Sequence, residues 1–239
     1  MKPPLAHGED YQYWLYELMR FIADHTSIPI PNFAVEMDAI TYNQYVVEKK
    51  VDPHMGKPLS VVWHLLEDGQ KHRIVVQLRD ILQLLRGIGI NKIPHAPCIT
   101  DRFIARNGCS PLNRRRPYTD NKGFVDILKD SVGAVNGDPH EANTNAKFVK
   151  ALASAEGNDL VLTHGNINAD DIYVSEKGSI VAISNWSESG FYPRYWEFIK
   201  ARLAYNSEPS FVEEGTIEKV LKPYWSELAI MTHAHNMIW

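Results

Sequence analysis

The chain has 239 residues and a mass of 27.2 kDa, which allows one large domain or two smaller lobes. A formal charge of −4 and a pI of about 6.2 disfavour general binding to nucleic acid. The sequence has no run of about 18 uncharged apolar residues and no signal-peptide core near its start, so we expect neither a membrane span nor secretion. The two cysteines, Cys98 and Cys109, fit a reducing compartment, and we expect a cytoplasmic protein.

The first predicted elements, in chain order, are one helix and two strands. Apolar residues recur at helical spacing before a proline-containing segment, and two later runs are rich in β-branched and aromatic residues. Pro53 and Gly56 then indicate a linker at 52–57. We therefore expect a reduced N-terminal lobe over residues 1–52 and a larger lobe over residues 53–239. The predicted helix lies at 11–25, and the predicted strands lie at Phe33–Met37 and 43–51.

The larger lobe is predicted to be mainly helical, with a small group of strands in its middle. Helical periodicity begins at Leu59, and three short β-type runs follow residue 159, with a hairpin turn at 175–178. This order indicates an α+β fold, whose ligand we expect between the lobes. The predicted helical segments are 59–66, 74–85, 124–132, 138–154, 195–205 and 213–232, and the strands are Leu160–Thr163, Ile172–Val174 and 179–183.

The most informative stretch begins at the end of the strand predicted at Leu160–Thr163. It reads T-H-G-N-I-N-A-D-D-I over 163–172, and I-S-N-W-S-E-S-G-F-Y-P-R-Y-W-E follows over 183–197. Two further segments, T-S-I-P-I-P over 26–31 and Y-V-V-E over 45–48, belong to the same pattern. From residue 11 to the C-terminus this pattern resembles the aminoglycoside phosphotransferase-like kinase family, in its fungal branch. The resemblance implies a protein-kinase-like α+β fold with a reduced N-terminal lobe and a mainly helical C-terminal lobe.

The resemblance also implies which catalytic groups have changed. The family has an Asp that accepts the substrate's proton where this chain has Asn166, and an amide cannot act as that base. The family's two Mg²⁺-holding positions, an Asn and an Asp, correspond here to Asp171 and Asn185. Neither a Gly-rich loop nor its lysine precedes the first helix. We therefore expect a degenerate pseudokinase without phosphate transfer, with no cofactor and no metal.

We expect the former catalytic cleft to bind a small organic molecule. Amides can donate and accept hydrogen bonds, whereas buried unpaired carboxylates are costly, so the Asp-to-Asn differences favour a neutral ligand. Bracing of the loop by His164, core packing of Trp186 and a solvated arginine loop at 114–116 are the structural alternatives. The catalytic candidates are Asn166, Asp171, Asn185 and Glu188, and the substrate-binding candidates are His164, Asn168, Trp186, Tyr192, Arg114 and Arg115.

Three functions remain open from the sequence. The first is a cofactor-free cyclase or isomerase, pericyclic in its narrowest form, of fungal secondary metabolism. The second is a non-catalytic pseudokinase that binds a partner protein or a ligand. The third is an active small-molecule phosphotransferase with swapped metal ligands. In each case the reduced sheet offers an edge through which the chain could form a homo-oligomer.

Overall fold

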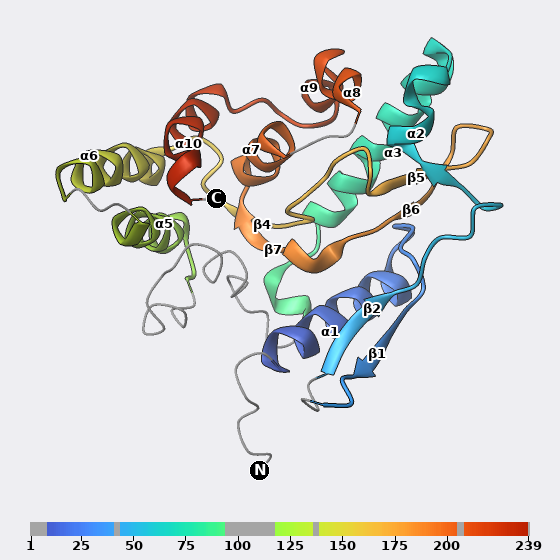
Figure 1. Ribbon diagram of the computed structural model, residues 1–239, viewed down its shortest axis with the longest axis horizontal. Helices are drawn as coiled ribbons and strands as arrows, with labels where there is room; N and C mark the ends of the chain where they lie inside the picture. The colour runs from blue at the N-terminus through green and yellow to red at the C-terminus, as the bar shows by residue number, and fades with distance from the viewer. Residues whose placement is uncertain (1–8, 41–43, 94–117, 136–138, 205–207, 239) are drawn as a thin grey trace.

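The computed structural model describes residues 9–40, 44–93, 118–135, 139–204 and 208–238 (Figure 1). Its N-terminal part is one helix packed beside a two-stranded antiparallel hairpin. Tyr16 on the helix meets Phe33 edge to face, and the Gln12 side chain accepts the Val46 N–H at 2.8 Å. The helix and the two strands predicted from the sequence are confirmed. They are α1 (Glu9–His25), β1 (Phe33–Met37) and β2 (Gln44–Glu48).

A long helix, α3, runs through the middle of the molecule. Its apolar residues recur every three or four positions, so a stripe that includes Leu78 and Leu82 is buried in the core. The linker predicted at 52–57 is wrong at its last residue, because Lys57 pairs with Val174 in a short antiparallel ladder. The elements of this part are β3 (Lys57–Pro58), α2 (Leu59–Val62), η1 (Trp63–Leu65), α3 (Asp68–Arg86) and η2 (Ile90–Lys92).

Two small antiparallel sheets lie beside α3 (Figure 1). One has the strand order β3-β5-β6, and the other pairs β4 with β7. The tight turn between β5 and β6 is confirmed: Gly178, at φ +74°, donates its N–H to the Ser175 carbonyl at 2.9 Å. The strand β7 is not predicted from the sequence, because two of its four residues are glycine and proline, which are uncommon in strands. The strands are β4 (Leu160–Thr163), β5 (Ile172–Val174), β6 (Ile180–Ile183) and β7 (Gly190–Pro193).

The C-terminal part is mainly helical, as predicted. The continuous helix predicted at 213–232 is wrong, because the chain forms three separate helices over this region, the first of which ends at Glu213. Gly215 takes a φ of +69° between the first two, and Pro223, which has no backbone N–H, precedes the third. The helices and 3₁₀ turns here are α5 (Asn121–Val135), α6 (Pro139–Lys150), η3 (Ala151–Ser154), η4 (Trp186–Glu188), α7 (Tyr195–Leu203), α8 (Pro209–Glu213), α9 (Thr216–Val220) and α10 (Trp225–Ile238).

One hydrophobic core joins α1 to the C-terminal elements. Trp14, Trp63 and Trp196 are at most 2% exposed and belong to the same cluster of buried apolar residues. Phe124 packs edge to face on Trp196, with ring centroids 4.9 Å apart. None of the described helices combines the length and the apolar character that a membrane span requires. The α+β class predicted from the sequence is confirmed.

Candidate functional site

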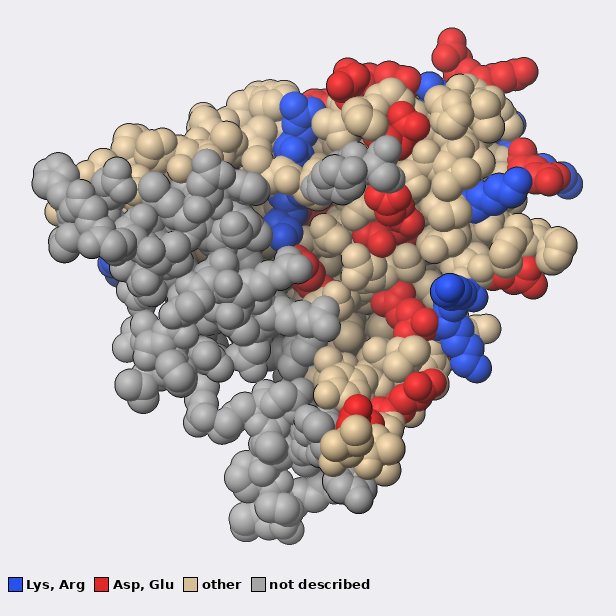
Figure 2. All heavy atoms as spheres, in the orientation of Figure 1, with Lys and Arg blue, Asp and Glu red and all other residues tan. Residues whose placement is uncertain are grey.

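The candidate site consists of the segment between β4 and β5 and the turn that follows β6 (Figure 1). The two parts lie close together at Gly165, where φ is +83° and an added Cβ would lie 2.2 Å from the Glu188 carbonyl oxygen. Glycine is required there, because any other residue would bring a Cβ into that backbone and disfavours this φ. Figure 2 shows acidic side chains near the middle of this face of the molecule.

His164 braces the segment from inside the core. Its Nε2 donates to the Ser184 carbonyl at 2.8 Å and its Nδ1 accepts the Asn166 N–H at 3.3 Å, so the proton sits on Nε2. The ring also meets Trp186 edge to face at 4.9 Å. Burial lowers the pKa of His164 to about 4, and the ring is neutral at physiological pH. The structure therefore places His164 in a supporting position beneath the loop.

Glu197 holds the same segment from the other side. This residue of α7 is buried, and its carboxylate accepts the N–H of His164 at 2.7 Å and that of Gly165 at 3.0 Å. Burial raises the pKa of Glu197, whereas the nearby Arg86 and these backbone hydrogen bonds lower it. Sequence reasoning gave Glu197 no role, although an acidic residue inside the apolar run of α7 is a signal that could have indicated one.

A carboxylate between two amides is the central feature of the site. Asn168 donates from Nδ2 to Oδ2 of Asp171 at 2.6 Å, and Asn185 donates from Nδ2 to the same oxygen at 3.2 Å. Both amides are oriented by further bonds. The Asn168 Oδ1 accepts the backbone N–H of Asp170 at 2.8 Å, and the Asn185 Oδ1 accepts the Ser187 hydroxyl at 3.0 Å. Their N–H groups therefore converge on Asp171.

The environment of Asp171 also changes its acidity. Burial raises the pKa of this carboxyl group from 3.8 to about 6, the two amide hydrogen bonds lower it, and the negative charges of Asp170 and Glu48 raise it again. A group with a pKa near 6 exchanges its proton readily around neutral pH. Asp171 is therefore suited to act as a general acid or base.

Glu48 connects the hairpin β1–β2 to this site. Its carboxylate accepts the backbone N–H of Asn185 at 2.7 Å and that of Trp186 at 2.8 Å. Asn185 has a φ of +66°, a left-handed conformation that non-glycine residues rarely adopt. Glu48 thus fixes the turn that presents the Asn185 amide to Asp171. Sequence reasoning placed Glu48 only in a strand between the lobes, since its partners lie 137 and 138 residues away.

The remaining predicted residues are distributed in three places. Asn166 is half-buried at the loop, and its side chain has no hydrogen-bond partner among the described residues. Glu188 forms an ion pair with Lys200 at 2.9 Å. Trp186 and Tyr192 lie inside the core. The predictions that fall outside the described residues concern Arg114, Arg115, Cys98 and Cys109.

Comparison with known proteins identifies the fold. No family model and no curated protein sequence matches the chain. Among solved structures, the chain is similar to the GDP and kanamycin complex of APH(2")-IIia, with a TM-score of 0.64 and 13% identity, over 96% of this chain and 74% of that one. The ADP-bound aminoglycoside phosphotransferase APH(2'')-Ib has a TM-score of 0.59 and 12% identity, over 99% and 77% of the two chains. Macrolide 2'-phosphotransferase MphH from Brachybacterium faecium has a TM-score of 0.53 and 13% identity, over 98% and 74%.

Identities this low show the fold alone. The chain therefore has an aminoglycoside phosphotransferase-like kinase fold, as the motif resemblance implied. Its assignment to the fungal branch and the loss of catalytic groups stay predictions.

Kinases of this kind use Mg²⁺, which binds where several oxygen atoms converge. Around Asp171 it is amide nitrogens that converge, because Asn168 and Asn185 turn their oxygens to other donors. Within the described ranges no group of three or more His, Cys, Asp or Glu side chains is placed to hold a metal ion. In the described arrangement the Asp171 carboxylate is therefore surrounded by amide donors.

Proposed function

We propose that this chain is a kinase-fold protein that binds a small organic molecule beside the loop between β4 and β5 and does not transfer phosphate. The observation that carries the proposal is the Asp171 carboxylate, held by the amide N–H groups of Asn168 and Asn185. Phosphate transfer depends on metal ions that neutralise developing charge, and this arrangement offers them hydrogen-bond donors instead. Asn166, at the position of the family's proton acceptor, supports the same conclusion.

The chemistry that we propose is a cofactor-free cyclisation or isomerisation. Such reactions gain most of their rate from holding a substrate in a reactive conformation and from moving one proton. Asp171, with a pKa of about 6, supplies a group that can take and return that proton. The Asn166 amide can donate to, or accept from, a neutral substrate at the exposed side of the loop. The narrower assignment to pericyclic chemistry in fungal secondary metabolism rests on the motif resemblance alone.

The division into lobes at residue 52 is part of the proposal. Glu48 would then join the smaller lobe to the turn that carries Asn185. Assembly of copies through the reduced sheet and a cytoplasmic location also stay proposals. The sheet that such an assembly would use is the two-stranded one, in which β1 pairs on one side with β2.

The second candidate is an active phosphotransferase with swapped metal ligands. It is favoured by the solved neighbours, whose complexes contain GDP or ADP, and by the one carboxylate that remains at Asp171. Binding of a partner protein by a non-catalytic pseudokinase has no comparable observation in its favour among the described residues. A nucleotide-binding measurement separates the first two candidates.

The test is thermal unfolding with ATP and with GTP, each in the presence and absence of Mg²⁺. A nucleotide at 100 times its Kd would add about 2.7 kcal/mol of stability, or roughly 5–11 °C in Tm for a chain of this size. We expect no Mg²⁺-dependent shift, and we expect Asn166→Asp to create no phosphate transfer. A Mg²⁺-dependent shift that Asp171→Ala abolishes would support the phosphotransferase instead.

A further inference from the structure

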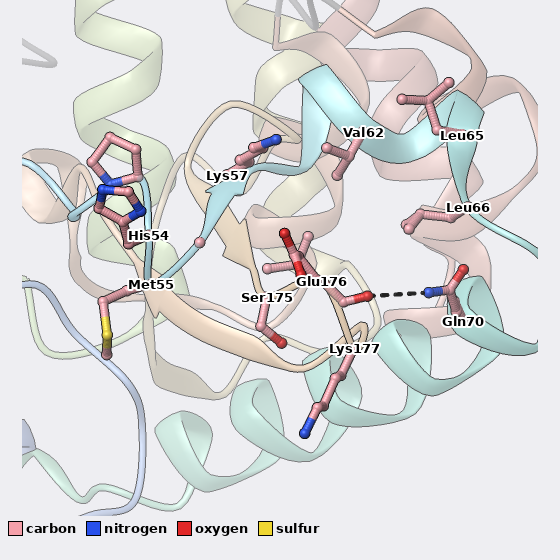
Figure 3. Close-up of a pocket in the computed structure, with 13 residues that line it drawn as sticks. His54, Met55, Lys57, Val62, Leu65, Leu66, Gln70, Ser175, Glu176 and Lys177 are labelled. Atoms are coloured by element: carbon pink, nitrogen blue, oxygen red, sulfur yellow. Dashed lines mark hydrogen bonds between the residues drawn. The ribbon is translucent and has the colours of Figure 1, made fainter.

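A pocket lies away from the candidate site, between α2, η1 and the β5–β6 hairpin (Figure 3). Its volume is about 770 Å³, which is within the range of small-molecule binding sites. None of its lining residues belongs to the loop between β4 and β5 or to the turn after β6. Its occupant can therefore differ from the substrate of that site.

The walls of the pocket include four apolar side chains, of which Val62 and Leu66 also pack against the core. Val62, Leu65 and Leu66 line one side, and Met55 lies at the opposite side (Figure 3). Leu65 is 71% exposed and Met55 is 63% exposed. Large apolar side chains grouped at a concave surface are typical of a binding site for an apolar group.

Three charged side chains line the pocket beside these apolar walls, and Lys177 of the β5–β6 turn adds a second positive charge to the two considered next. Lys57 comes from β3 and Glu176 from the turn of the neighbouring hairpin, and both line the pocket. Both side chains are exposed, and in the part of the chain that the structure describes neither head group has a hydrogen bond or an ion pair. A ligand that carries both charges could satisfy them together.

The pocket is held in shape by α3. The Gln70 side chain donates to the Glu176 carbonyl at 3.4 Å, and the Gln77 side chain donates to the Gly178 carbonyl at 3.1 Å. Gln77 also accepts the Ile180 N–H at 3.1 Å, so the hairpin is fixed to the helix along its length. Because the hairpin backbone is fixed to α3 before a ligand arrives, binding does not have to order that wall of the pocket.

We propose that this pocket binds a small zwitterion with an apolar side chain, that is, an amino acid or a close derivative. The ammonium group pairs with Glu176, the carboxylate pairs with Lys57, and the side chain contacts Leu65 and its apolar neighbours. This proposal goes beyond the function proposed above and does not depend on it, since the two sites share no residue.

The first test is calorimetric titration of the full chain with L-phenylalanine and L-leucine. We expect saturable binding of at least one of them. 3-Phenylpropionate lacks the ammonium group, phenethylamine lacks the carboxylate, and glycine lacks the side chain, so each is expected to bind at least about tenfold more weakly. If neither amino acid binds, or if an analogue with one charge binds as tightly as L-phenylalanine, the proposal is overturned.

The second test uses variants of the pocket. Lys57→Gln and Glu176→Gln are each expected to weaken binding about tenfold, and Leu65→Ser is expected to weaken it as well. The matched controls are Lys122→Gln and Glu213→Gln, at exposed positions on other elements, which should bind as the original chain does. All substitutions are at exposed side chains, and an unchanged Tm shows that each variant is folded. Equal affinity in the pocket variants and the controls would refute the assignment.

Discussion

Asp171 couples the protonation of one carboxyl group to the stability of the whole chain. Burial raises its pKa from 3.8 to about 6. Between pH 4 and pH 6 the folded protein therefore keeps a proton that the unfolded chain has released. The stability associated with this group is fully present below about pH 4 and is lost as the pH rises through 6, so the ionised carboxylate costs stability at neutral pH.

Asp171→Asn removes this ionisation while keeping the shape of the side chain. The new amide oxygen can still accept the N–H groups of Asn168 and Asn185. We expect the variant to be more stable than the original chain by about 2 kcal/mol at pH 7, with the difference shrinking towards zero near pH 4. The measurement is denaturant unfolding of both proteins at four values between pH 4 and pH 7.

Comparing the original chain with Asp171→Asn separates the pH dependence of stability caused by Asp171 from that caused by His164. The pKa of His164 is lowered by burial, so its contribution to stability decreases as the pH falls below 6.5, in the opposite direction. This contribution is the same in both proteins and cancels in the difference. A difference in free energy of unfolding that is constant across the pH range would contradict the raised pKa of Asp171.

At the scale of elements, the close contact between the β4–β5 loop and the turn after β6 depends on Gly165. Gly165→Ala places a Cβ against the Glu188 carbonyl and forces an alanine into a positive φ. We expect a loss of about 3 kcal/mol or more in the free energy of unfolding. Gly69→Ala is the control, because no atom lies within 4 Å of its added Cβ and alanine favours the helix α3. Equal effects of the two substitutions would show that the loop adjusts freely.

The helices and strands also show how far the sequence predicts the structure. The strands β4, β5 and β6 and the turn at Gly178 are predicted, because the residues of each element are themselves typical of a strand or a turn. The division of the C-terminal segment into α8, α9 and α10 is missed, because its apolar periodicity continues across Gly215 and Pro223. β7 is missed because two of its four residues are glycine and proline, which are uncommon in strands.

The candidate site is likewise predicted only in part from the sequence. The motif places Asn166, Asp171 and Asn185 in one loop region, and the structure brings the last two into contact. The roles of Glu48 and Glu197 are absent from the prediction, because each carboxylate binds backbone N–H groups on a distant part of the chain. Backbone partners leave no residue-type signal, so the sequence does not identify which groups these two carboxylates bind.

At the scale of the whole molecule, Glu48 joins the N-terminal hairpin to the turn after β6. Its two oxygens accept the backbone N–H groups of Asn185 and Trp186, and a charged acceptor makes such bonds stronger than a neutral one. Glu48→Gln leaves one amide oxygen and turns an NH₂ group towards the second backbone N–H. We expect a loss of about 1–3 kcal/mol in the free energy of unfolding.

The amides that lose protection in Glu48→Gln show whether Glu48 joins the hairpin to the turn after β6 or makes only a local contact. In hydrogen exchange, Glu48→Gln should accelerate the amides of β1, β2 and the turn at 184–188 together, while the amides of α7 keep their protection. Glu36→Gln, at an exposed position on β1 of the same hairpin, is the control and should change neither region. Faster exchange in the hairpin alone would mean that the hairpin and the turn respond independently. Faster exchange in both supports a single unit in which the N-terminal hairpin fixes the conformation of Asn185, and through it the environment of Asp171.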